Sequence, residues 1–298
     1  MKELKGTFVV TVTPFTTEDN LDEEGLRGNI DWYIKEGIHG IACAGSTGEF
    51  VSLSEEEWER VTNITIEQVN HRVPVLVGTC GGQPTTKATI KRTKYAKDAG
   101  ADGALIVHPY YSRSNEEELY EHYKKIAEAV DIPIMIYNNP LTTHTDASPE
   151  QLATLAKDFP NIRYIKESSG QIQRVQEIIS LAGDHVAVFC GDDVLAFESF
   201  VLGAKGWIAA SANIIPKKCA QLFELMEKGN IAEARNLWFK IVPLTSSVEG
   251  WGRLAQTAKK GLDLLGRAGG PSPRGPKLDI TKEQEKELMK LLSDLGEL

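Results

Sequence analysis

The most constraining feature of this chain is a series of short apolar runs that recur along its first two thirds. The runs are rich in Val, Ile, Ala and Leu and span residues 6–13, 38–45, 73–79, 102–109, 132–138, 162–167, 186–191 and 206–211. Their apolar residues are nearly continuous rather than alternating, which is typical of strands covered on both faces. Strands of this kind form parallel sheets, so the sequence predicts an α/β fold.

Amphipathic segments with helical periodicity separate these runs. They span residues 22–36, 54–70, 84–99, 115–130, 148–158, 171–183 and 193–203. Ser54 precedes three glutamates, which is the pattern of a capping box with acidic residues in the first turn. About eight strand–helix units in 298 residues predict a TIM (β/α)8 barrel. A doubly wound sheet is the alternative, but no GxGxxG pattern follows the first strand.

The strand signals stop at about residue 228. Helical patterns follow near residues 230–242, 247–266 and 281–296, interrupted by a Gly- and Pro-rich stretch at residues 269–276. We therefore expect a barrel carrying the catalytic site at residues 1–228 and a C-terminal helical appendage at residues 229–298.

Composition narrows the classes of function. The net charge of −9 argues against nucleic-acid binding, which needs a basic surface. No apolar stretch is long enough to cross a membrane, and the N-terminus has no apolar signal core. The four cysteines form no CxxC pair and the six histidines show no ligand spacing, so we expect no metal site. A cytoplasmic protein with buried, reduced thiols is expected.

Two strand ends carry side chains suited to covalent chemistry. Lys166 ends the run at 162–167, and Tyr137 ends the run at 132–138. In a TIM barrel the C-terminal ends of the strands share one rim, where active sites lie. An amine there is costly to bury as a cation and nucleophilic once it has lost its proton. An amine beside a phenolic proton carrier indicates Schiff-base chemistry on a carbonyl substrate.

Other strand ends on the same rim add polar groups. Residues 45–49 read Gly-Ser-Thr-Gly-Glu and can hold a carboxylate through hydroxyls and backbone N–H groups. Residues 108–111 read His-Pro-Tyr-Tyr, and residues 191–193 read Gly-Asp-Asp. Judged alone, each has an ordinary explanation as a turn, a packing aromatic or a helix cap. Their joint placement on one rim favours a site.

Together these motifs resemble the dihydrodipicolinate synthase/N-acetylneuraminate lyase family. The resemblance runs from Thr13 to the turn near residue 270, nearly the whole chain. It implies a TIM barrel with C-terminal helices and a class I lyase or synthase. Such an enzyme forms a lysine Schiff base with pyruvate or a related 2-oxo acid, without a metal or organic cofactor. It also implies a homotetramer built as a dimer of dimers.

The resemblance assigns roles to individual residues. Lys166 matches the Schiff-base lysine and Tyr137 the proton-relay tyrosine. Tyr111 matches a tyrosine that reaches into the neighbouring subunit's site. The expected catalytic residues are thus Lys166, Tyr137, Thr47 and Tyr111. The expected substrate-binding residues are Ser46, Thr47, Gly48, Thr142, Ser168, Asp192, Ile208 and Ser211.

Two departures from the family pattern bear on the substrate. Thr142 stands where the lysine-biosynthetic synthases usually carry an arginine that binds a substrate carboxylate, and a hydroxyl does not replace a bidentate guanidinium. Ala210 stands where the sialic-acid lyases have serine. The hydroxyl-rich rim favours a hydroxylated 2-oxo acid of the 2-keto-3-deoxy sugar acid type. The alternatives are 4-hydroxy-tetrahydrodipicolinate synthase, 1-pyrroline-4-hydroxy-2-carboxylate deaminase and a non-catalytic 2-oxo-acid-binding or regulatory barrel.

Overall fold

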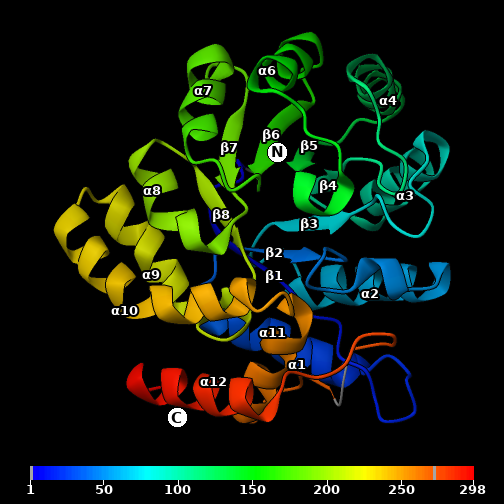
Figure 1. Ribbon diagram of the computed structural model, residues 1–298. Coiled ribbons are helices and arrows are strands. Elements are labelled where there is room, and N and C mark those ends of the chain that lie inside the picture. Colours follow the sequence, from blue (N-terminus) through cyan, green and yellow to red (C-terminus); the bar gives the residue numbers. More distant parts are fainter. Residues whose placement is uncertain (1–2, 271–272) are drawn as a thin grey trace.

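Eight parallel strands close into a barrel in the computed structural model, which describes residues 3–270 and 273–298 (Figure 1). The strands are β1 (Gly6–Val10), β2 (Gly40–Cys43), β3 (Val75–Gly78), β4 (Gly103–Val107), β5 (Ile134–Asn138), β6 (Ile162–Glu167), β7 (Ala187–Cys190) and β8 (Gly206–Ala209). Their order around the barrel follows the chain, and β1 closes it by pairing with β8. Each lies within a predicted strand range, which confirms the TIM barrel.

Helices surround the strands. The α-helices of the barrel are α1 (Glu23–Lys35), α2 (Glu55–Val69), α3 (Thr86–Ala99), α4 (Glu116–Ala129), α5 (Pro140–Thr143), α6 (Pro149–Asp158), α7 (Gln173–Ala182), α8 (Ala196–Val201) and α9 (Pro216–Glu227). Three short 3-10 helices are η1 (Phe50–Ser52), η2 (Asp193–Leu195) and η3 (Ser211–Asn213). The C-terminal helices are α10 (Ile231–Gly250), α11 (Leu254–Leu264) and α12 (Lys282–Asp294).

Three helices differ from the sequence-based expectation. The first is the four-residue α5, which was not predicted. Helix α9 was not predicted, although its buried Cys219, Leu222 and Phe223 follow the i, i+3, i+4 pattern of a helix face. Helix α10 continues through Pro243, where the predicted helices leave a gap. Proline removes one backbone donor, but buried neighbours such as Leu244 keep this stretch packed and helical.

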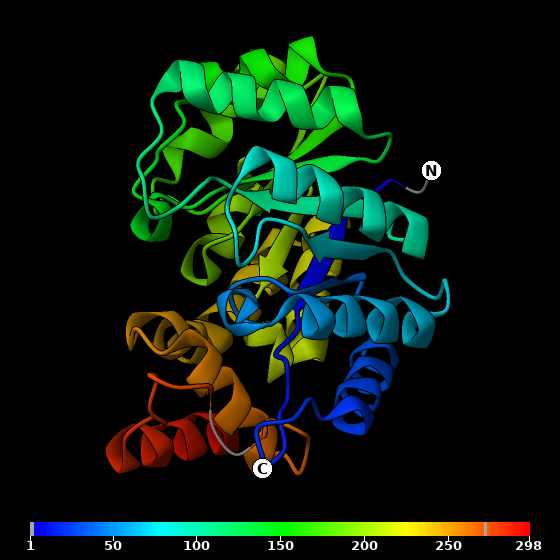
Figure 2. The same ribbon diagram turned by 90° about the vertical axis from the view of Figure 1, so that its right-hand side faces the viewer.

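A buried ion pair links the C-terminal helices to the barrel. Figures 1 and 2 show α11 and α12 on the opposite side of the barrel from α4 and α6. Lys259 of α11 lies 2.5 Å from Glu49, which follows β2, and both side chains are buried. Burial lowers the pKa of Lys259, and Glu49 opposes that shift. Arg274, in the described part of the predicted turn at 269–276, binds Glu49 through its backbone N–H and Glu57 through its guanidinium. Residues 271–272 of that turn lie outside the described residues.

Aromatic rings fill the barrel interior below the C-terminal ends of the strands. Phe8 of β1 and Phe189 of β7 meet edge to face with centroids 5.7 Å apart, although their strands are not neighbours. The ring of Tyr164 in β6 packs edge to face on the same Phe189 ring, with the two centroids 5.8 Å apart. Gly40 and Gly206 leave room for these rings, because a Cβ at either position would lie 2.1 Å from a ring carbon. The packed interior leaves the C-terminal ends of the strands as the place for a site.

All four cysteines are buried and carry free thiols. Within the described residues, no helix combines the length and the apolar character needed to cross a membrane.

Candidate active site

Lys166 and Tyr137 lie side by side inside the barrel mouth. Strands β5 and β6 are neighbours, and their register places Tyr137 directly opposite Lys166. Successive strand residues point to opposite faces, so Lys166 shares the interior face with Tyr164, two residues earlier. The Lys166 Nζ lies 3.7 Å from the centroid of the Tyr137 ring, and the lysine is only 4% exposed. The predicted pair of amine and phenol is therefore assembled in the geometry of a cation–π contact.

Gly191 provides the space that the lysine chain occupies. A Cβ at this position would lie 2.7 Å from the Cε of Lys166 and 1.9 Å from the Oγ of Ser168. Both contacts are shorter than van der Waals distance, and the lysine carbon is buried. The glycine after β7 is thus a packing requirement of the site rather than only a turn residue.

A pocket of about 420 Å³ opens above this pair. Eight of the residues predicted from the sequence line it: Ser46, Thr47, Tyr137, Thr142, Lys166, Ser168, Asp192 and Ile208. They come from the ends of five different strands and the loops that follow them. The volume is that of a small-molecule site, with polar groups converging on one amine.

Three predicted residues lie elsewhere. Gly48 faces the first strand, where its carbonyl oxygen accepts a hydrogen bond from Thr13 Oγ1 at 2.8 Å. Ser211 is fully buried and donates to Asp193 at 2.5 Å instead of lining the pocket. Tyr111 is 97% exposed in the loop before α4, with a left-handed φ of 78°. Their predicted contacts with substrate stay predictions.

The pocket also contains residues that were not predicted. Asn139 donates from Nδ2 to the Tyr137 hydroxyl at 2.8 Å and so fixes the phenol. The period of two along the strand could have revealed it, because Asn139 follows Tyr137 on the same face. Glu249 at the end of α10 and Lys277 in the C-terminal segment line the pocket as well. Neither has a local sequence signal that points to the barrel mouth.

A buried polar network supports the outer face of the same strands. Asn138 and Glu167 point away from the interior and are joined by a 3.1 Å hydrogen bond. His108 Nε2 lies 3.0 Å from Asn138 Oδ1, which can only accept, so this nitrogen carries the proton. His108 Nδ1 lies 2.8 Å from the Tyr123 hydroxyl, which donates to the Ile106 carbonyl oxygen at 3.1 Å. Burial lowers the pKa of His108 to about 4 and raises the pKa of Glu167.

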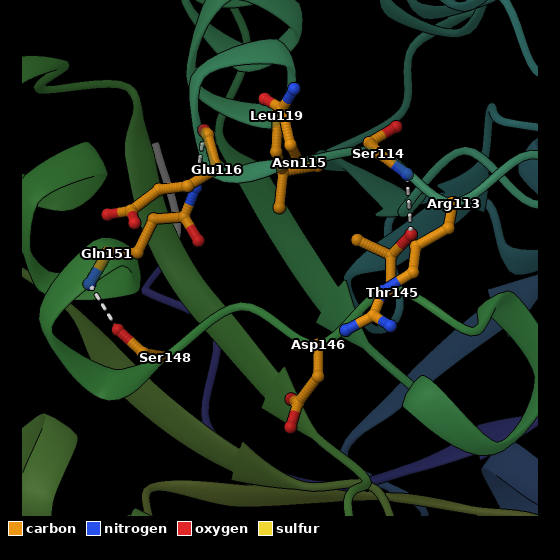
Figure 3. Close-up of a pocket in the computed structure, with 9 residues that line it drawn as sticks. All are labelled: Arg113, Ser114, Asn115, Glu116, Leu119, Thr145, Asp146, Ser148 and Gln151. Atoms are coloured by element: carbon orange, nitrogen blue, oxygen red, sulfur yellow. Dashed lines mark hydrogen bonds between the residues drawn. The ribbon is translucent and has the colours of Figure 1, made fainter.

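A second pocket, of about 370 Å³, lies between the loop before α4 and the loop before α6 (Figure 3). Arg113, Ser114 and Thr145 lie close together there, and the Ser114 N–H donates to Thr145 Oγ1 at 3.2 Å. None of the residues predicted from the sequence lines this pocket. The pocket with Lys166 is therefore the candidate active site.

Comparison with known proteins agrees with this geometry. Residues 3–295 match the family model described as the dihydrodipicolinate synthetase family. The chain belongs to this family. A 4-hydroxy-tetrahydrodipicolinate synthase of Thermodesulfovibrio yellowstonii is 44% identical over 244 residues, 82% of each chain. One of Syntrophus aciditrophicus is 39% identical over 296 residues, 98% of each chain.

Solved structures of the dihydrodipicolinate synthase family have the same architecture. The synthase from Acinetobacter baumannii, solved with pyruvate, has a TM-score of 0.93 and 34% identity, covering 99% of this chain and 100% of its own. A prophage protein of the family from E. coli, also in complex with pyruvate, has a TM-score of 0.93 and 30% identity over the full length of both chains. At the level of its family, the chain is a Schiff-base-forming lyase of the class I aldolase type. The relatives favour the synthase alternative over the sugar-acid reading.

The neutral state of His108 predicts a pH-dependent stability. The unfolded histidine has a pKa of about 6.5 and the folded one of about 4, so on acidification the unfolded chain binds the proton first. Below pH 6.5 this residue therefore lowers the free energy of unfolding progressively, by about 3 kcal/mol near pH 4. Urea unfolding at a series of pH values from 7.5 to 4 measures this change in the free energy of unfolding. His108→Gln should reduce the slope against pH, whereas the exposed His185→Gln should keep it. Equal slopes in the wild type and both variants contradict the lowered pKa of His108.

Proposed function

We propose that Lys166 condenses with the keto carbon of pyruvate to form a Schiff base. The observation that carries this is the buried amine against the Tyr137 ring, open to a pocket with hydroxyls from Ser46 and Thr47. The two hydroxyls hold the pyruvate carboxylate and so fix the carbonyl within attack distance. Tyr137, oriented by Asn139, carries protons as the carbinolamine collapses. The protonated imine then draws electrons from pyruvate to give the enamine.

For the second substrate, we propose an aldehyde acceptor, as in 4-hydroxy-tetrahydrodipicolinate synthase. Relatives with 38–44% identity carry that name. One feature of the sequence argues against synthase activity. Thr142 stands where the synthases usually carry an arginine that binds the carboxylate of the acceptor. Lys277 supports the proposal, because it lines the same pocket and brings a cation that position 142 lacks. An ammonium gives a charge-assisted contact with a carboxylate, although without the bidentate geometry of arginine.

A hydroxylated 2-oxo acid is the second candidate. The observation that favours it is the hydroxyl lining of the pocket by Thr142 and Ser168. Hydroxyls of this kind match the hydroxyls of a 2-keto-3-deoxy sugar acid. In that case the enzyme would cleave or convert the acid through the same imine on Lys166.

Chemical trapping tests the imine. Borohydride reduction in the presence of pyruvate should add a stable mass to the peptide that contains Lys166, because reduction locks the imine carbon onto Nζ. Lys166→Ala should show no adduct and no turnover while keeping the fold. Lys205→Ala, an exposed lysine at the start of β8, is the control and should behave as wild type. An adduct at another lysine, or full turnover by Lys166→Ala, refutes the proposal.

A substrate panel tests the acceptor. Pyruvate with aspartate semialdehyde should give condensation, and Lys277→Ala should raise the KM for the semialdehyde about tenfold, since one charged hydrogen bond is lost. The KM for pyruvate should stay unchanged, as should both constants in the exposed control Lys282→Ala. Turnover of a 2-keto-3-deoxy sugar acid, a sialic acid or hydroxypyrroline carboxylate, without condensation of the semialdehyde, assigns the second candidate instead.

We further propose a homotetramer, built as a dimer of dimers, in which Tyr111 enters the partner's pocket. Its support is the ring itself, 97% exposed on a backbone held in the left-handed region. Sedimentation should give the tetramer mass. Tyr111→Ala and Lys166→Ala should each be inactive alone. Co-expressed in equal amounts they should recover about a quarter of wild-type activity, because half of the dimers are hybrids with one complete site. Full activity of Tyr111→Ala, or no recovery in the hybrids, contradicts this role.

A further inference from the structure

Two carboxyl groups lie on one wall of the candidate active site. This wall is formed by the end of β7 and the end of α10. Asp192 follows β7, and Glu249 comes from the last turn of α10; both line the pocket that contains Lys166. The carboxyl of Asp192 lies beside that of Glu249, and this neighbour raises the pKa of Glu249. Glu249 also accepts a hydrogen bond from the Asp193 N–H at 2.8 Å through Oε1. These contacts fix the Glu249 carboxyl at the pocket wall.

A proton is required between these two groups. Neighbouring carboxylates repel each other when both are ionised, so this pair is favourable only if one carboxyl is protonated. Burial, followed by the charge of Asp193 and the contact with Asp192, raises the pKa of Glu249 to about 10. Asp193 does not compete for this role, because Trp207 Nε1 and the backbone and hydroxyl of Ser211 occupy its oxygens. Glu249 therefore carries the proton at neutral pH.

The same wall presents a polar atom that lacks a partner. Ser168 Oγ is buried, and it has no hydrogen bond with any described residue. Ser168 lines the pocket beside Lys166 and lies against Gly191, the residue before Asp192. Buried hydroxyls in proteins are nearly always hydrogen-bonded. The Glu249 carboxyl lines the pocket on the same wall, and in its protonated form it can donate to a polar group of a ligand there.

We propose that Glu249 is a second acid–base residue of the site, donating its proton to the carbonyl oxygen of the aldehyde acceptor. The inference rests on the proposed function. The enamine carbon on Lys166 attacks the aldehyde carbon, and a carbon–carbon bond forms as the C=O π bond breaks. The oxygen takes the proton of Glu249 and becomes a hydroxyl, while the nitrogen of Lys166 returns to an iminium. Glu249 regains a proton from water, and in cleavage it accepts the proton instead. Asp192 is a positioning residue that holds the acid.

Tyr137 is placed for the other half of the reaction. Its ring lies against the Lys166 amine, and its hydroxyl is held by Asn139. It therefore serves proton transfers at the imine and at the pyruvate carbons. One acid at each end of the pocket allows the two half-reactions to be separated by experiment.

Glu249→Gln tests this separation. Glutamine keeps the size, still accepts from the Asp193 N–H and still donates to Asp192, but it cannot release a proton. Exchange of the pyruvate methyl hydrogens in D₂O, followed by NMR, needs only the imine and the enamine, so it should match wild type. Turnover with the acceptor should fall about 10²–10⁴-fold, the usual effect of removing a positioned acid. Glu233→Gln, an exposed glutamate in the first turn of α10, is the matched control and should leave both rates unchanged.

The pH profile gives an independent readout. The charged and titratable groups that line the same pocket as Glu249 are Asp192, Asp193, Lys166, Tyr137 and Lys277. Asp192→Asn removes the carboxyl beside Glu249, so the alkaline loss of turnover should move to lower pH.

Three results overturn the inference: wild-type turnover in Glu249→Gln, parallel loss of exchange and turnover in that variant, or an unshifted profile in Asp192→Asn. Failure of the proposed function looks different, because wild type itself would then show neither a Lys166 adduct nor methyl exchange.

Discussion

The burial of one amine without a counter-ion is the constraint on which the rest of this structure depends. Lys166 takes part in none of the ion pairs formed among the residues that the structure describes. Burying an ammonium without a partner is unfavourable, so the site must stabilise it by other means or use it as a neutral nucleophile. The Tyr137 ring and the open pocket stabilise the buried amine, and the proposed condensation with a ketone would use it as a nucleophile. The fold places a destabilising group where its reactivity is useful.

Strand alternation lets the barrel hold this group rigidly. Tyr137 and Lys166 point inward, while the next residues, Asn138 and Glu167, point outward. The outward pair is anchored by His108 and by Arg174, which lies 3.7 Å from Glu167. Because one residue in each strand is hydrogen-bonded on the outside, the backbone that carries its inward neighbour is held in place. The polar network behind the sheet thus supports the strand ends that carry Lys166 and Tyr137.

The sequence predicted pocket residues at the strand ends and in the loops that follow them, and it missed those that the C-terminal region brings to the pocket. Continuous apolar runs identify strands buried on both faces, and their C-terminal ends must share one rim. That logic suffices for Lys166 and Tyr137. Glu249 reaches the rim from a helix 56 residues beyond Asp193, and no local pattern records such a contact. Lys277 follows a Gly- and Pro-rich turn whose path depends on tertiary anchors such as Arg274.

Substrate preference was harder to predict for the same reason. The prediction based on Thr142 considered only the loops at the strand ends. A threonine in place of an arginine there implied the loss of a contact with a substrate carboxylate. The C-terminal segment brings Lys277 to the pocket and changes the charge that an acceptor meets. The charge of this pocket is therefore a property of the barrel and its C-terminal region together, although Lys166 and Tyr137 belong to the barrel.

The protonation of Glu249 and the chemistry of Lys166 depend on each other. Asp192, Asp193 and Glu249 bring three carboxyls to one side of a small pocket. If all three were ionised, they would repel an anionic acceptor and would favour the ammonium form of any nearby amine, which is not nucleophilic. A shared proton between Asp192 and Glu249 removes one negative charge at neutral pH. The same proton that makes Glu249 an acid thus also limits the negative potential around the lysine.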